Sequence, residues 1–160
     1  MASDFFLKLE GIEGESADDA HPNEIVALSW SWGVSQSGSA HMGAGAGAGK
    51  ASAQDMSFTK FVDKSSPELM KRCSNGKHVP TATLIARKAG EKPLEYLKIT
   101  MTDVLISSYQ TGGSGGEDLL VESVTLNFGA IEVEYTEQGK DGSKGKATKA
   151  KFDIAKNVTT

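Results

Sequence analysis

The sequence predicts a mainly β fold, a β-barrel of two packed sheets with one short α-helix on its outside. Three observations support this prediction. Several stretches alternate apolar with polar residues, only one segment has helix start and stop signals, and glycine-rich turns separate the stretches. The length of 160 residues fits a single domain over residues 1–160, and the 38% hydrophobic content is enough for a core.

The stretch over residues 94–138 predicts two long strands, which the glycine-rich loop TGGSGG connects. Side chains alternate between the two faces of a strand, so each run has one apolar and one more polar face. In the second run the apolar parity changes after Gly129, which predicts a β-bulge there. The apolar residues before and after that change are Leu120, Val124, Leu126 and Phe128, then Ile131, Val133 and Tyr135.

Residues 24–36, EIVALSWSWGVSQ, predict another strand with two unlike faces. The apolar face, which we expect to pack inside the barrel, holds Val26, Leu28, Trp30, Trp32 and Val34. The other face holds Ala27, Ser29, Ser31 and Gly33. A solvent-facing strand usually carries Lys, Glu or Thr, so a face of small and hydroxylic residues is unusual.

The remaining elements are shorter. Strands are predicted at residues 5–9, 56–62 and 81–87 and around Phe152 and Ile154. Residues 139–151 are rich in Lys and Gly and are predicted to form a solvated loop. A helix is predicted at residues 65–76, with Ser65 and Glu68 at capping-box spacing and Gly76 as its stop. Its docking face is predicted to hold Leu69, Met70 and Cys73.

Residues 38–51, GSAHMGAGAGAGKA, form a low-complexity arm. The arm is similar to a phosphate-binding loop, but Ala44 replaces the first required Gly and Ala51 replaces the Ser or Thr that should follow Lys50. We therefore expect an arm that orders against a neighbouring molecule rather than a nucleotide site.

No pattern in the sequence supports an enzyme. His21, His41 and His78 lie far apart in loop-like sequence and are expected to be scattered surface residues, and no cofactor or metal site is predicted. The single cysteine, Cys73, is expected to be a small buried side chain. Asp103 interrupts an apolar strand face, so it is expected either as a paired buried carboxylate or at a strand end, a bulge or a subunit boundary.

The net charge of −4 argues against a nucleic-acid partner. The N-terminal segment has neither a basic start nor a long apolar run, so a cleaved signal peptide and membrane insertion are not expected. Synthesis in the cytoplasm follows, and export without a cleaved signal remains open.

The sequence resembles the haemolysin-coregulated protein (Hcp) family, the tail-tube subunits of bacterial type VI secretion systems. The resemblance covers essentially the whole chain and is carried by these segments in order: WSWGVSQSG, the glycine arm ending at Gly49 and Lys50, FTKFVDKSSPELMKRCSNGKH, SSYQTGGSGGED and ESVTLNFGAIEVEY. The C-terminal basic segment is less characteristic.

The resemblance implies a homohexameric ring that stacks into a tube, which a contractile sheath drives out of the cell behind a spike protein. It also implies that small effector proteins ride in the lumen, with the ring as their receptor and chaperone. On this basis Ser29 and Ser31 are expected to face the lumen while Trp30 and Trp32 fill the barrel. The arm residues expected at subunit or ring contacts are Gly43, Gly45, Gly47, Gly49 and Lys50.

Two other hypotheses stay open from the residues alone. A small-molecule-binding barrel is suggested by the β pattern and the two tryptophans, and would need a cavity lined by them. A hydrolase with an unrecognised nucleophile has the least support.

Overall fold

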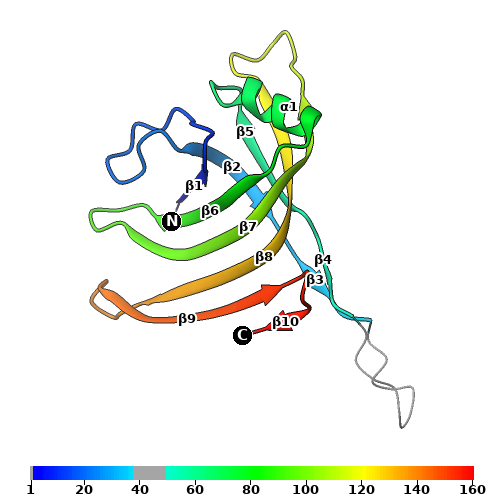
Figure 1. The fold of residues 1–160 in the computed structure, drawn as a ribbon. Coiled ribbons are helices and arrows are strands. Elements are labelled where there is room, and N and C mark those ends of the chain that lie inside the picture. The colour runs from blue at the N-terminus through cyan, green and yellow to red at the C-terminus, as the bar shows by residue number, and fades with distance from the viewer. Residues whose placement is uncertain (1, 38–49) are drawn as a thin grey trace.

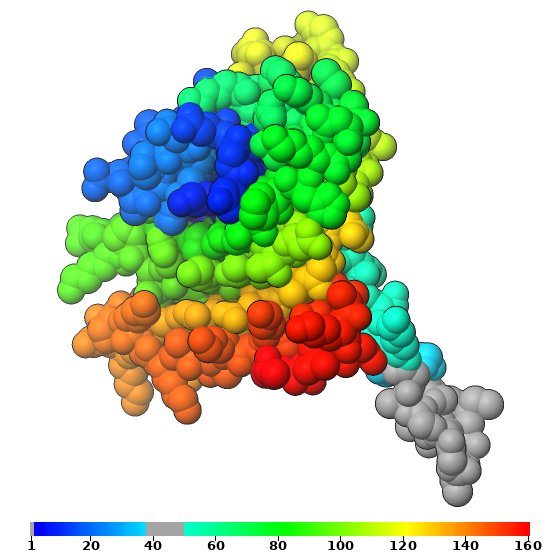
Figure 2. Space-filling model, in the orientation of Figure 1, coloured from blue at the N-terminus to red at the C-terminus, as the bar shows by residue number. Residues whose placement is uncertain are grey.

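The computed structural model describes residues 2–37 and 50–160 and confirms a mainly β barrel with one flanking helix (Figure 1). Six strands pair in the order β8-β5-β2-β1-β6-β7, and β7 pairs again with β8 to close the barrel. Their bounds are β1 Ser3–Leu9, β2 Ile25–Ser31, β5 Met56–Phe61, β6 Val79–Lys88, β7 Leu94–Thr111 and β8 Val121–Gln138. Side chains fill the space that separates the ribbons (Figure 2).

Strand β8 is long enough to use two partners on one edge. Its first part pairs with β5, from Val121 opposite Phe61 to Leu126 opposite Met56. Its later part pairs with β9 (Lys144–Asp153), which in turn pairs with the two-residue β10 (Val158–Thr159). A further small hairpin, β3 (Val34–Ser35) with β4 (Ser52–Ala53), projects from the end of the barrel strands (Figure 1).

The prediction of a loop over residues 139–151 is wrong for most of its length, because β9 begins at Lys144. The first eight residues of β9 are all exposed, so the strand has no apolar parity for a sequence pattern to detect. Backbone pairing with β8 holds it instead. Lysines along an edge strand are typical, because they oppose pairing with further strands.

The predicted bulge at Gly129 is also wrong. Thr102 pairs with Ala130 and Val104 with Phe128, so the register between β7 and β8 passes Gly129 without a shift. The irregular residue is Asp103, whose φ of +54° is rare for a residue with a side chain. At this pair of residues the inward-facing positions of β7 and of β8 change from odd to even numbers or the reverse, although neither strand gains an extra residue.

A β-bulge occurs instead in β2, at Leu28, where the register against β5 shifts between Ala27 and Ser29. The bulge exchanges the faces of the strand: Ile25 and Ala27 are buried before it, and Trp30 and Trp32 pack against the core after it. The expected continuous apolar face is therefore wrong for Val26, Leu28 and Val34, which are 47%, 41% and 52% exposed. Ala27 belongs to the core and not to the small-residue face.

Helix α1 (Ser66–Asn75) forms where predicted and ends at Gly76, whose φ is +69° and whose N–H donates to the Arg72 carbonyl. The predicted capping box is absent from this described helix, since Ser65 donates to Asp63 and Glu68 accepts from Arg72. Leu69 is fully buried, but Met70 is half exposed, and Arg72 lies on the docking face in its place.

A buried ion pair joins the N-terminus of α1 to the barrel. Lys60 on β5 is 0% exposed, and its Nζ lies 2.5 Å from Oε1 of Glu122 on β8 and 2.9 Å from Oδ1 of Asp63. Ser66 and Tyr109 also donate to Glu122. Burial opposes ionisation of Glu122, but hydrogen bonds from Lys60, Ser66 and Tyr109 outweigh it and hold the pKa of this carboxyl below its usual value.

We expect Lys60→Met to lower the free energy of unfolding by about 3–5 kcal/mol, because Glu122 would keep its burial and lose its cation. Urea denaturation measures this change. Lys60→Met combined with Glu122→Leu should recover much of the loss, since no charge is left unpaired. A loss for the single variant within about 0.5 kcal/mol, as for a surface position, would contradict the account.

Candidate functional site

Four neighbouring strands carry small hydroxylic side chains on the outside of the barrel. The pairing registers place them in rows across β2, β5, β8 and β7. One row runs Ser29, Thr59, Ser123, Gln110, and the next runs Ser31, Ser57, Thr125, Ser108. We call this surface the hydroxyl face and define it by Ser29, Ser31, Ser57, Thr59, Ser108, Ser123 and Thr125.

Hydrogen bonds between strands hold the hydroxyl face in one arrangement. The hydroxyls of Ser29 and Thr59 lie 2.6 Å apart, and those of Ser108 and Thr125 also lie 2.6 Å apart. At the edge of the face, Asp55 accepts from Ser107 at 2.6 Å and from Asn127 at 2.9 Å. Hydroxyls both donate and accept, so each can also exchange its partner for a group on another molecule.

The hydroxyl face is built by the same alternation that builds the core. On β5, Met56, Phe58 and Lys60 point inward and are buried, which leaves Ser57 and Thr59 on the outer side. On β8, Val124 and Leu126 are buried, which leaves Ser123 and Thr125 outside. The composition of this surface is therefore independent of the packing beneath it.

Of the predicted site residues, Ser29 and Ser31 are exposed on the outer side of β2, opposite Trp30 and Trp32. Trp30 packs edge-on against Phe5, with ring centroids 6.3 Å apart. Lys50 is exposed just before β4, on the side of the projecting hairpin that faces away from the barrel. Gly43, Gly45, Gly47 and Gly49 lie outside the described residues.

Ser57, Thr59 and Ser108 were not predicted as part of this surface. The more polar face predicted for the second long strand was not connected to β2. A strand register is needed to join them, and no single strand pattern contains that information.

An apolar row borders the hydroxyl face at one end of the same strands. The registers place Phe61 opposite Val121. Val26 precedes Ala27, which pairs with Lys60, so Val26 lies next to Phe61 on the neighbouring strand. These three side chains are 47% (Val26), 39% (Phe61) and 41% (Val121) exposed. A hollow of about 240 Å³ lies beside Val26 and Phe61, with Glu15 and Asp63 also lining it.

Of the two described histidines, one differs from the expected surface scatter. His21 is only 7% exposed, which corrects that prediction, and its contacts are described below. His78 is exposed and its Nδ1 lies 2.7 Å from Oδ1 of Asp103, which is itself exposed rather than buried. His41 lies outside the described residues. Cys73 is free and half-buried rather than fully buried.

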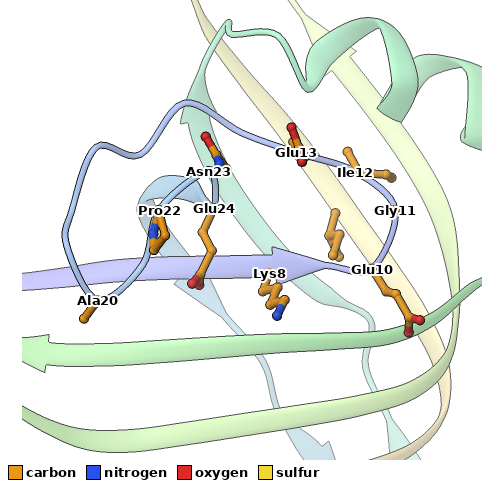
Figure 3. Close-up of a pocket in the computed structure, with 10 residues that line it drawn as sticks. Lys8, Glu10, Gly11, Ile12, Glu13, Ala20, Pro22, Asn23 and Glu24 are labelled. Carbon is orange, nitrogen blue, oxygen red and sulfur yellow. The ribbon is translucent and has the colours of Figure 1, made fainter.

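A pocket of about 560 Å³ lies beside the end of β1 and the loop that follows it (Figure 3). Residues of β1 and the turn after it, including Lys8, Glu10 and Glu13, form one part of its wall, and Ala20, Pro22, Asn23 and Glu24 form another. Lys8 and Glu10 also line a neighbouring hollow of about 370 Å³ with Thr81 and Thr83.

Within residues 2–37 and 50–160, no helix has the length and apolar character needed to span a bilayer. Over the same described ranges, no three His, Cys, Asp or Glu side chains gather in a way that could hold a metal ion.

The fold places the chain in the class of closed β-barrels with one flanking helix. A sequence model of the family described as "Type VI secretion system effector, Hcp" matches residues 6–135. Over 160 residues the chain is 58% identical to "Protein hcp1" of Pseudomonas aeruginosa, covering 99% of each chain.

Solved structures agree with this match. The crystal structure of Hcp1 from Salmonella typhimurium is 42% identical, with a TM-score of 0.84 over 100% of both chains. A type VI secretion system effector from Yersinia pestis is 37% identical, with a TM-score of 0.78 over 94% of this chain and 100% of that one. The chain therefore belongs to the Hcp family of the type VI secretion system, whose members are secreted proteins.

The exchange of faces at Leu28 can be tested with two glutamine substitutions in one strand. We expect Ala27→Gln to lower the melting temperature by several degrees, because Ala27 is 4% exposed and a longer polar side chain would enter a filled core. Ser31→Gln should leave the melting temperature nearly unchanged, because Ser31 faces outward. Equal losses for the two variants in a thermal melt would contradict the placement of the bulge.

Proposed function

We propose that the chain is the structural subunit of the type VI secretion tail tube. Six copies form a ring, rings stack into a tube that is exported, and the lumen of the ring is the receptor and chaperone for small secreted effectors. The observation that carries this proposal is the hydroxyl face, which would line the lumen. Its partners would be further copies of itself, the spike protein, the contractile sheath and the effectors.

The chemistry of the hydroxyl face suits the wall of a channel for proteins. Small side chains keep the bore wide. Hydroxyl groups can donate to or accept from many polar surfaces, but each such contact contributes only about 0.5–1.5 kcal/mol because water competes for it. A wall of this kind holds different cargoes weakly and releases them, whereas a wall of one charge would select its cargo.

A closed ring needs two different surfaces on each subunit that fit one another. The chain offers surfaces of distinct chemistry for this purpose, the lysine-rich strand β9 and the projecting hairpin β3–β4, with Lys50 just before β4. We infer that Lys50 and the glycines of the arm contact a neighbouring subunit or ring. The role proposed is structural, with no catalytic residue, cofactor, nucleic-acid partner or membrane insertion.

We infer that the protein is cytoplasmic before the system fires and leaves the cell without a cleaved signal peptide.

Light scattering of the purified protein tests the ring. We expect a mass of about six subunits, each of 16.9 kDa, with a central hole in negative-stain images. A strict monomer at high concentration would contradict the proposal.

The Ser31→Gln variant tests the carrier role. The longer side chain should leave the ring intact and weaken retention of an effector that is co-expressed with the chain, because it narrows the lumen and replaces a hydroxyl contact. Co-purification of the effector with the ring measures retention. Thr83→Gln, a matched change on β6 outside the hydroxyl face, should retain the effector as the unchanged chain does. Equal retention of every effector tried by both variants would show that Ser31 is not a contact.

A further inference from the structure

Charged side chains attach the loop between β1 and β2, residues 10–24, to the rest of the chain. Glu13 and Glu15 near its start contact Lys64, and two further sets of charged side chains hold its second half against the barrel. The loop also has backbone bonds of its own, since Gly14 donates to Asn23, Asn23 to Ser16 and Ser16 to Glu24. Both ends of the loop line the 560 Å³ pocket, residues 10–13 next to the end of β1 and Ala20, Pro22, Asn23 and Glu24 across from them (Figure 3). The position of residues 20–24 relative to residues 10–13 therefore sets the width of that pocket.

The first attachment is His21, which is buried between two carboxylates. Its Nδ1 lies 2.9 Å from Oε2 of Glu24, in the same loop, and its Nε2 lies 2.5 Å from Oε1 of Glu95, on β7. The imidazole ring stacks on Phe6 of β1, with centroids 4.4 Å apart and planes 16° apart. The stack and the two carboxylates leave the ring little freedom to turn away.

This geometry requires a particular protonation state. A neutral imidazole has one N–H, so it can donate to Glu24 or to Glu95 but not to both. The other ring nitrogen would then direct a lone pair at a carboxylate oxygen. Only the imidazolium donates at both nitrogens, and each bond is then charge-assisted.

The second attachment is Arg87 on β6, which donates to Asp18 of the loop at 3.0 and 2.6 Å and lies 3.4 Å from Asp4 on β1. Arg87 lowers the pKa of Asp18 to about 2, so this pair stays charged across the neutral range. Asp18 also accepts the backbone N–H of His21. The charged groups around His21 are thus Asp18 and Glu24 from the loop, Asp4 from β1, Arg87 from β6 and Glu95 from β7.

We propose that His21 is a proton-dependent clasp for the β1–β2 loop: as imidazolium it bridges Glu24 in the loop to Glu95 on β7, and its deprotonation releases that side of the loop. The Asp18–Arg87 attachment remains in both states, so the loop loosens on one side instead of unfolding. The pocket beside it then becomes wider and more variable. This inference does not depend on the ring or its cargo.

The direction of the pH dependence follows from the pKa of His21. Burial lowers this pKa, but the hydrogen bonds and charges of Glu24 and Glu95 outweigh burial, so the pKa in the folded chain is above its ordinary value. The clasp therefore stabilises the folded chain fully below the unfolded value of about 6.5. Its contribution is lost as the pH rises through the raised folded value.

Hydrogen exchange followed by mass spectrometry on the purified protein tests the clasp. After correction for the intrinsic effect of pH on exchange, we expect amides in residues 14–23 to exchange about tenfold faster above the His21 titration than below it, the equivalent of one charge-assisted hydrogen bond. Glu95→Ala should give the fast exchange at both pH values, because it removes the hydrogen-bond acceptor of His21 on β7, and this side chain is 45% exposed and replaceable. His78→Gln, at the exposed histidine, should behave as the unchanged chain.

Two results would overturn the proposal. One is loop exchange whose corrected pH dependence is the same in the unchanged chain and in Glu95→Ala. The other is an NMR titration in which the imidazole of His21 has a pKa at or below about 6.5, its unperturbed value. The titration needs no variant, so it decides the question even where a substitution disturbs folding.

Discussion

The structure depends on the pairing of β7 with β8, which closes the barrel. The two strands are the longest in the chain, and they pair from Leu97 opposite Tyr135 to Thr111 opposite Glu122. Because β8 also pairs with β5 at one end and with β9 at the other, this pairing determines where both neighbours lie. A slip of one residue would turn Val124 and Leu126 outward and Ser123 and Thr125 inward, and would remove the core and the hydroxyl face together.

The hydroxyl face and the core are thus two sides of one sheet, but they meet different demands. The inner side must be apolar and closely packed, because a cavity or an unpaired polar group there is costly. The outer side carries no such requirement for folding, yet across four strands it holds small hydroxylic side chains in place of the usual long charged ones. The proposed role of this face as the wall of a protein channel would account for that composition.

The sequence was sufficient to predict the fold class and helix α1 with its stop at Gly76. These features follow from alternation and from capping chemistry, both of which act over a few residues. The resemblance to the Hcp family was also correct and was carried by segments spread along the chain. The prediction of a loop where β9 lies failed because an exposed strand has no apolar side to reveal it.

Other features could not be predicted because they depend on contacts between distant segments. The bulge at Leu28 shows only when β2 is placed against β5. A bulge was predicted at Gly129 because the positive φ of Asp103, on the strand across from it, could not be known from the sequence. Lys60 and Glu122 are 62 residues apart, and nothing in either strand indicated that they bury each other's charge. His21 was expected at the surface because its partner on β7 is 74 residues away.

The central claim is that the hydroxyl face lines the lumen of a ring. Electron cryo-microscopy of the purified assembly tests it most directly, because the map places each strand relative to the symmetry axis. The account predicts Ser29, Ser31 and Thr59 on the wall of a central channel in every subunit. A map with these side chains on the outer rim, or covered between subunits, would contradict it.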